Sequence, residues 1–140
     1  MCLASARVVQ RYVFDQVDDP RLHGFLVWGP MLDDDDRADA LRASRFMDDP
    51  RSSHFWTDDD LLAARFSAAA GLPDGELAWD TFLLFAPGQV WQDGGPPQPA
   101  LAMHVGKSLP AEQRLHGPTL QRQVRDLLDG AAQRAGSGDR

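Results

Sequence analysis

Cysteine is almost absent from this chain of 140 residues, where Cys2 is the only one. A single cysteine excludes an internal disulfide and a cysteine-based zinc site within one chain. Such usage is typical of a reducing compartment, so we expect a cytoplasmic protein. The sequence also lacks an apolar stretch near the roughly 20 residues that span a bilayer, and no long apolar segment at the N-terminus indicates a secretory signal.

Positive charge is also scarce, since 14 Lys and Arg stand against 21 Asp and Glu, for a formal net charge of −7. Binding to nucleic acids and to anionic membranes depends on Lys and Arg, so we expect neither as a partner of this acidic protein. Length and composition are typical of one soluble globular domain over 1–140, with a disordered polar tail over 136–140. The sequence indicates no oligomeric state.

The first half of the chain predicts helices and strands in alternation. A stripe of valines indicates a helix over 5–17, and a near-continuous apolar run over 22–28 indicates a strand that is buried on both faces. Four aspartates over 33–36 favour a helix start, because carboxylates cap free N–H groups and complement the helix dipole. A short strand is expected over 52–56.

The second half predicts a helix, a hairpin and a last helix. Thr57 and Asp60 form a variant of the capping box, and Gly71 is a natural C-terminal cap for the helix that they begin. A strand over 77–85 is expected to turn back into an antiparallel partner over 89–92.

Residues 101–105 are expected to form a short edge strand, and Gly117-Pro118 begins the clearest amphipathic helix. The resulting order is helix, strand, helix, strand, helix, hairpin, helix. Two right-handed crossovers and a hairpin in this order predict an α/β domain with a mixed central sheet between helical layers.

This element order, from Leu22 to Ala135, resembles that of the thioredoxin fold. Val27-Trp28-Gly29-Pro30-Met31 is similar to the Trp-Cys-Gly-Pro-Cys active site of that family, with the first cysteine absent and Met31 at the place of the second. His54-Phe55-Trp56 and Ala78-Trp79-Asp80 look like segments of uncharacterised bacterial thioredoxin-like proteins. The resemblance implies a three-layer sandwich with helices on both faces of the sheet.

The departures from the family pattern exclude its chemistry. Thiol–disulfide exchange needs a low-pKa thiolate at the helix start, and Met31 cannot supply one. The family also places a cis-proline just before the third strand, where this chain has Glu76-Leu77. We therefore expect a protein without dithiol oxidoreductase activity and without a cofactor. The resemblance implies that the groove beside Trp28-Gly29-Pro30-Met31 binds a peptide or protein partner, with Met31 as a soft apolar contact.

Tryptophans stand at the ends of the expected strands. Trp28, Trp56 and Trp79 would place large amphipathic rings at the rims of the sheet, and Trp91 would do so in the return strand. Such rings either line a pocket for an apolar or planar ligand, or fill the core with the indole N–H hydrogen-bonded. Both alternatives remain open at this point.

A second hypothesis is an acid–base or metal-dependent enzyme centred on Asp80. This residue begins the third strand beside Trp79, and a partly buried carboxylate is suited to proton transfer. With His54 and His104 it makes a set of two histidines and one carboxylate, as found around zinc or iron. The alternative is three separate polar residues at strand ends, because no ligand spacing supports the set. The aspartates of 33–36 are expected to cap a helix and not to bind metal.

Overall fold

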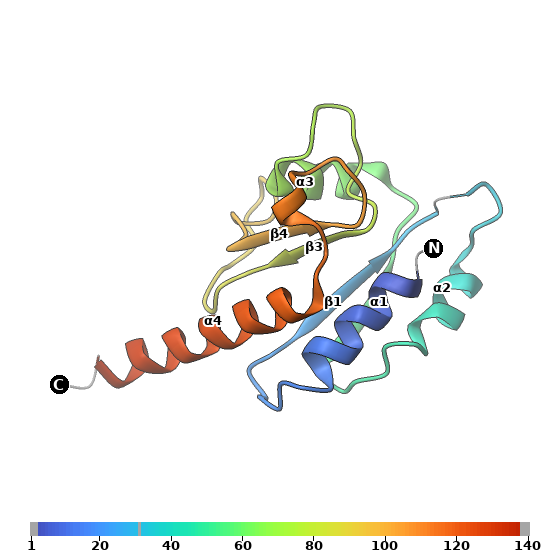
Figure 1. The fold of residues 1–140 in the computed structure, drawn as a ribbon. Coiled ribbons are helices and arrows are strands. Elements are labelled where there is room, and N and C mark those ends of the chain that lie inside the picture. The colour runs from blue at the N-terminus through green and yellow to red at the C-terminus, as the bar shows by residue number, and fades with distance from the viewer. Residues whose placement is uncertain (1–2, 31, 138–140) are drawn as a thin grey trace.

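The structure, a computed structural model, describes residues 3–30 and 32–137. The first half contains α1 (Leu3–Val9), the π-helical segment η1 (Gln10–Phe14), β1 (Gly24–Trp28), α2 (Arg37–Ser44) and β2 (Ser52–Trp56). The second half contains α3 (Asp60–Ala70), β3 (Thr81–Leu84), β4 (Leu101–His104), the short 3-10 helix η2 (Ala111–Gln113) and α4 (Gly117–Ser137). The mixed α/β class is confirmed (Figure 1).

The strands form two separate two-stranded sheets, and not the single mixed sheet that was expected. β1 and β2 are parallel, with Trp28 opposite Trp56. β3 and β4 are antiparallel, with Thr81 opposite His104. The return strand expected over 89–92 is wrong. Proline cannot donate to a strand ladder, so the proline-rich segment after β3 forms loops, and pairing resumes only at β4.

One face of the β1–β2 pair is packed and the other is exposed. Leu26 and Trp28 contact clusters that α1, α2 and α4 supply, so these helices cover one face only. Phe25 and Val27 alternate with them on the opposite face, where 72% of Phe25 is exposed. The prediction that this strand is buried on both faces is therefore wrong.

The β3–β4 pair, in contrast, is packed on both faces. Phe82 and Met103 contact the cluster that η1 and α4 supply. Leu83 and Ala102 point to the opposite face and contact the end of α3 at Ala70. At this sheet, residues of η1 and α4 thus pack on one face and Ala70 of α3 packs on the other.

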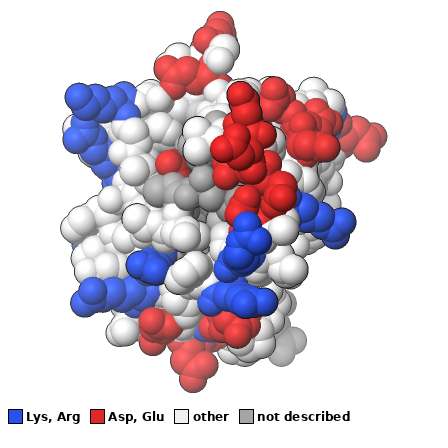
Figure 2. Space-filling view, turned by 90° about the vertical axis from the view of Figure 1, so that its right-hand side faces the viewer, with Lys and Arg blue, Asp and Glu red and all other residues white. Residues whose placement is uncertain are grey.

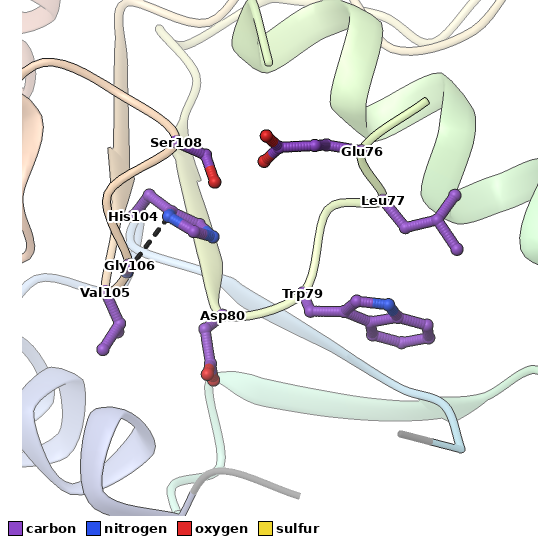
Figure 3. Close-up of a pocket in the computed structure, with 8 residues that line it drawn as sticks. All are labelled: Glu76, Leu77, Trp79, Asp80, His104, Val105, Gly106 and Ser108. Carbon is purple, nitrogen blue, oxygen red and sulfur yellow. Dashed lines mark hydrogen bonds between the residues drawn. The ribbon is translucent and has the colours of Figure 1, made fainter. Parts of the chain in front are cut away.

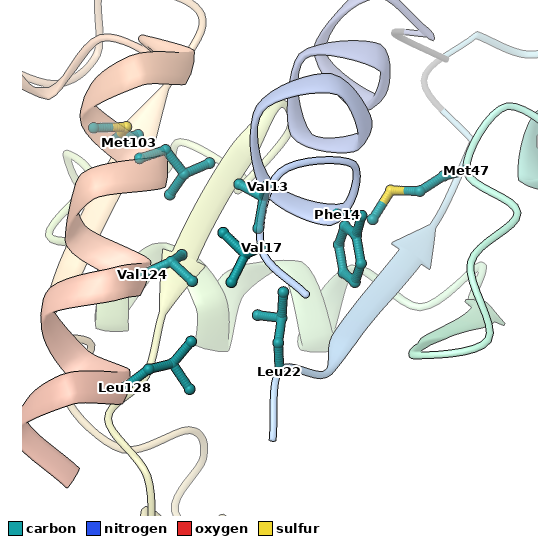
Figure 4. Packing of buried hydrophobic residues seen from close by; sticks show 9 residues of the cluster. Val13, Phe14, Val17, Leu22, Met47, Met103, Val124 and Leu128 are labelled. Carbon is teal, nitrogen blue, oxygen red and sulfur yellow. The ribbon is translucent and has the colours of Figure 1, made fainter. Parts of the chain in front are cut away.

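The main core lies between η1, β4 and α4 (Figure 4). Its buried residues are Val13, Phe14, Val17, Leu22, Met47, Met103, Leu120, Val124 and Leu128. Gly117 begins α4 as expected, and a Cβ added there would overlap the Tyr12 ring. The absence of a side chain at this position therefore allows α4 to approach η1 closely.

The helix ends follow the expected caps with small shifts. Asp36 caps α2 and forms a capping box with Asp39. Asp59, and not Thr57, caps α3, and Gly71 ends it at a positive φ of 74° as expected. None of the described helices has the length and apolar character of a bilayer-spanning segment.

The tetrapeptide Asp-Asp-Pro-Arg occurs twice, ending at Arg21 before β1 and at Arg51 before β2. In each copy the second aspartate accepts hydrogen bonds from the backbone N–H and from the side chain of the arginine. The Arg21 guanidinium lowers the pKa of Asp19 from 3.8 to about 2. In the same way, Arg51 lowers the pKa of Asp49.

Both arginines also bind backbone carbonyls of distant helical segments. Arg21 donates to the Leu128 carbonyl oxygen of α4 at 3.1 Å. Arg51 donates to the Phe14 carbonyl at 2.8 Å, at the end of η1, and to the Val17 carbonyl in the segment that follows η1. Phe14 is the last residue of η1, where the carbonyls of a helix run out of donors from their own helix, so the Arg51 guanidinium supplies a donor there and ties the end of η1 to the start of β2.

Candidate functional site

A pocket of about 400 Å³ opens where β3 begins and β4 ends (Figure 3). Two segments line it, and their residues are Glu76, Leu77, Trp79, Asp80, His104, Val105, Gly106 and Ser108. The pairing of Thr81 with His104 brings the two segments together, although more than twenty residues separate them along the chain. The site is therefore a product of the antiparallel register.

His104 presents one ring nitrogen to this pocket. Its Nδ1 accepts a hydrogen bond from the backbone N–H of Gly106 at 3.0 Å. The proton of the neutral imidazole then sits on Nε2, which faces the space between Glu76 and Trp79 in Figure 3. A Cβ on Gly106 would lie 2.6 Å from the His104 ring, so this close approach requires glycine. The arrangement prepares His104 as a hydrogen-bond donor to a bound group.

Glu76 and Ser108 also point into this space (Figure 3), and the sequence did not single out either as a site residue. Within the part of the chain that the structure describes, neither side chain forms a hydrogen bond or an ion pair. No local motif marks them. The signal that would have found them is the strand pairing, because both flank the paired ends of β3 and β4.

Asp80 reaches the pocket, but its carboxylate turns toward α1. It accepts a long hydrogen bond of 3.4 Å from the Ser5 hydroxyl, and Figure 3 shows it directed away from His104. Its φ of 50° lies in the left-handed region, which aspartate adopts more readily than most residues with a side chain. The Asp80 carbonyl accepts the Val105 N–H at 3.2 Å, which ties the two lining segments together.

His54 lies on the packed face of β2, and the protein uses both of its ring nitrogens. Nδ1 accepts the Trp28 indole N–H at 3.0 Å, and Nε2 lies 3.1 Å from the Met47 carbonyl oxygen, to which it donates. Across residues 3–30 and 32–137 no group of three or more histidine, cysteine, aspartate or glutamate residues is placed to hold a metal ion. The structure thus brings Asp80 and His104 to one pocket and leaves His54 apart.

Trp28 is a core residue and is not among the residues that line the pocket. Only 8% of it is exposed, and it packs with Ala6, Ala40 and Ala43. Trp56 is partly buried against the same cluster. Both tryptophans therefore pack their rings in the core, which was one of the two alternatives. The Trp28 indole N–H is also hydrogen-bonded, as that alternative requires.

Gly29 belongs to the expected groove and lies against Trp79, which lines the pocket. It is buried under Trp79, and a Cβ there would lie 3.0 Å from the Trp79 ring. The half-buried Pro30 follows it at the end of β1, and Met31 lies outside the described residues. Trp79 therefore packs beside Gly29 and is also one of the residues that line the pocket.

Acidic side chains gather on one part of the surface in Figure 2, next to Lys and Arg side chains on the same face. The pocket has the same sign, since Glu76 and Asp80 line it and no Lys or Arg does. No protein-family model, curated protein or solved structure matches this chain. Geometry and chemistry of the pocket therefore carry the functional argument.

Proposed function

We propose that the protein is a thioredoxin-like interaction module without redox activity, which binds an extended segment of a partner protein in the pocket between β3 and β4. The single observation that carries this proposal is one open pocket that Trp79, Glu76, His104 and Ser108 line. The order of elements from β1 to α4 supports the thioredoxin-like part, as does Gly29-Pro30 at the end of β1.

The chemistry of the lining residues suits a peptide. The imidazole of His104 supplies a donor, the Glu76 carboxylate an acceptor and the Ser108 hydroxyl both, while Trp79 supplies apolar surface. A peptide backbone presents donors and acceptors in alternation, which such a set can bind. The cavity is open, whereas pockets for small molecules enclose most of their ligand, so a segment of a larger partner fits better.

A second candidate function is acid–base catalysis, and one observation favours it. His104 faces the cavity with a defined tautomer, and the Glu76 carboxylate points to the same space. Asp80, the residue expected in this role, has its carboxylate turned away. Any turnover found for the protein should be lost in His104→Gln if this second function is correct, and full turnover in that variant would exclude it.

The proposed cellular location and the excluded classes of partner are argued from the composition. We propose a cytoplasmic protein, because one cysteine suits a reducing compartment. With a net charge of −7, nucleic acids and anionic membranes are not its proposed partners.

Selection from a displayed library of random linear peptides tests the proposed function. We expect enriched sequences whose binding to purified protein is lost in Trp79→Ala, because this residue is the largest apolar side chain that lines the pocket. Trp91→Ala is the matched control, since Trp91 is 46% exposed and does not line the pocket. No enrichment, or equal binding by the two variants, would reject the proposed site.

A further inference from the structure

The β1–β2 sheet has an apolar face that is largely exposed. Phe25 and Val27 of β1 and Phe55 of β2 stand on it, with exposed fractions of 72%, 40% and 51%. The ring centroids of Phe25 and Phe55 are 6.3 Å apart, so the rings form one continuous surface. The three side chains expose roughly 300 Å² of apolar surface, since one aromatic side chain presents about 150–250 Å². Patches of about 300–600 Å² on a monomer are often functional.

The outer edge of β2 offers backbone hydrogen-bonding groups beside this face. The Arg51 carbonyl, one residue before β2, accepts the Gly24 N–H at 2.9 Å. Because successive strand residues direct their backbone groups to alternate sides, those of His54 and Trp56 point away from β1. Within residues 3–30 and 32–137 these groups have no hydrogen-bond partner. Such an edge is a template for pairing with a further strand.

Exposed aspartates follow β2 directly. Asp58, Asp59 and Asp60 are exposed, and no Lys or Arg of the described chain forms an ion pair with them. The aspartates of 33–36 follow β1, which ends at the same edge of the sheet because the two strands are parallel. The carboxyl end of this sheet therefore attracts cationic groups.

Area and charge together decide which occupant fits this surface. A stable dimer buries about 800 Å² on each subunit, which is more than twice the apolar patch. Two copies with a net charge of −7 also repel each other. A second copy of the chain is therefore a poor occupant, whereas a basic segment of another protein is complementary to the acidic end of the sheet.

We propose that β2 binds, on its outer edge, an extended segment of a basic partner protein as an added strand. Alternate apolar side chains of the segment pack beside Phe55, and Lys or Arg at one end lies near Asp58. The backbone groups of His54 and Trp56 bind the backbone of the segment, as in other cases of strand addition. This surface is separate from the pocket, since no residue of β1 or β2 lines the pocket.

A titration followed by amide hydrogen exchange and ¹H–¹⁵N NMR tests the proposal. The probe is the peptide acetyl-Lys-Lys-Val-Thr-Val-Thr-Val-Lys-Lys-amide. At saturation, the backbone N–H groups of His54 and Trp56 should exchange at least about tenfold more slowly, because the added strand gives them acceptors. A probe with Glu in place of each Lys should bind at least about fivefold more weakly.

Two N-methylated versions of the probe separate strand addition from side-chain packing alone. In each version every second residue is N-methylated, and the two versions together cover the whole probe. A strand that pairs on one edge uses only alternate N–H groups, so one version should lose binding and the other should keep it.

Exposed apolar residues supply a matched pair of variants. Phe55→Thr removes the ring and keeps a β-branched strand residue, and it should weaken the probe by about fivefold. Leu41→Gln is the control, because Leu41 is 66% exposed on α2, which covers the packed face of the sheet. This change should leave the affinity for the probe unchanged.

The charge at the end of β2 has its own pair of double variants. Asp58→Asn together with Asp60→Asn leaves the α3 cap Asp59 intact, and it should weaken the Lys probe by about threefold. Asp126→Asn together with Asp129→Asn changes the net charge equally on exposed positions of α4, which packs against η1. The second pair should leave the affinity unchanged.

Unchanged exchange at His54 and Trp56 at high millimolar probe would overturn the proposal. Equal binding of the Lys and Glu probes, or of the two N-methylated versions, would do so as well, and so would equal effects of Phe55→Thr and Leu41→Gln. Sedimentation of the protein alone tests the second copy, since a dimer that Phe55→Thr dissociates would replace the proposed partner. The proposed function is judged separately, because Trp79→Ala should leave the binding of this probe unchanged.

Discussion

Replacing Arg51 by alanine should destabilise the protein more than replacing Arg21, the arginine of the other Asp-Asp-Pro-Arg segment. Its side chain is only 18% exposed and makes bonds in two directions. Two go to the Asp49 carboxylate, at 2.9 and 2.8 Å, and others go to the carbonyls of Phe14, which ends η1, and of Val17, which follows it. The cation also lies 5.2 Å from the centroid of the Phe14 ring.

The expected loss is about 3 kcal/mol in the free energy of unfolding. Breaking a buried ion pair on one side costs about 3–5 kcal/mol, because the remaining charge and acceptors are left without partners. Partial exposure of Arg51 allows water to reach some of them, so the lower end applies. Such a loss is a large share of the total of about 5–15 kcal/mol that a domain of this kind has.

Urea unfolding followed by tryptophan fluorescence measures this loss. Arg21→Ala is the control, since it breaks the same local bonds in the other copy of the motif, where 47% of the arginine side chain is exposed, and its loss should be clearly smaller. Arg51→Lys should recover only part of the stability, because an ammonium group cannot make the forked set of bonds. A loss below about 1 kcal/mol for Arg51→Ala, as for a surface pair, would refute this reasoning.

Two further predictions concern acid pH and close packing. Arg51 lowers the pKa of Asp49 below 3.8 in the folded state, so this carboxylate contributes stability above about pH 4 that is lost as the pH falls through the pKa of the folded state. Asp49→Asn should therefore flatten the acidic part of the pH–stability curve. An unchanged slope would contradict a lowered pKa of Asp49. Gly117→Ala should lower stability by about 2 kcal/mol in urea unfolding, because its Cβ would overlap Tyr12. Gly130→Ala, in the same helix, meets only a flexible arginine end at 3.5 Å and should stabilise by up to about 1 kcal/mol, so similar effects of the two changes would contradict the packing.

Local signals predicted many of the helix ends correctly. Gly71 ends α3, Gly117 begins α4, and the apolar stripe of α4 with Leu120, Val124 and Leu128 is buried as expected. Such features depend on residues within one or two turns, so the chain specifies them without reference to the rest of the fold. α4 continues through Ser137, into the tail expected from Gly136, and 138–140 lie outside the described residues.

Non-local pairings were harder to predict. An apolar run such as Phe25-Leu26-Val27-Trp28 is compatible with burial on one face or on two, and only the positions of the helices decide between them. The partner of β3 depended on how far the proline-rich loop extends, and the sequence alone favoured the nearer segment. The two Asp-Asp-Pro-Arg copies do not reveal in sequence which distant groups their arginines bind. The tertiary structure places them at the carbonyls of Leu128, Phe14 and Val17.

Composition alone led to the expectation of no dithiol chemistry, since the sequence has one cysteine, and it determines the negative charge of the protein. The site itself was decided by tertiary structure. Glu76 and Ser108 are ordinary loop residues until the register that pairs Thr81 with His104 places them around one cavity. The physical reason is that caps and stripes arise from neighbours in sequence, whereas a pocket arises from strand pairing between distant segments, whose geometry the whole packed molecule determines.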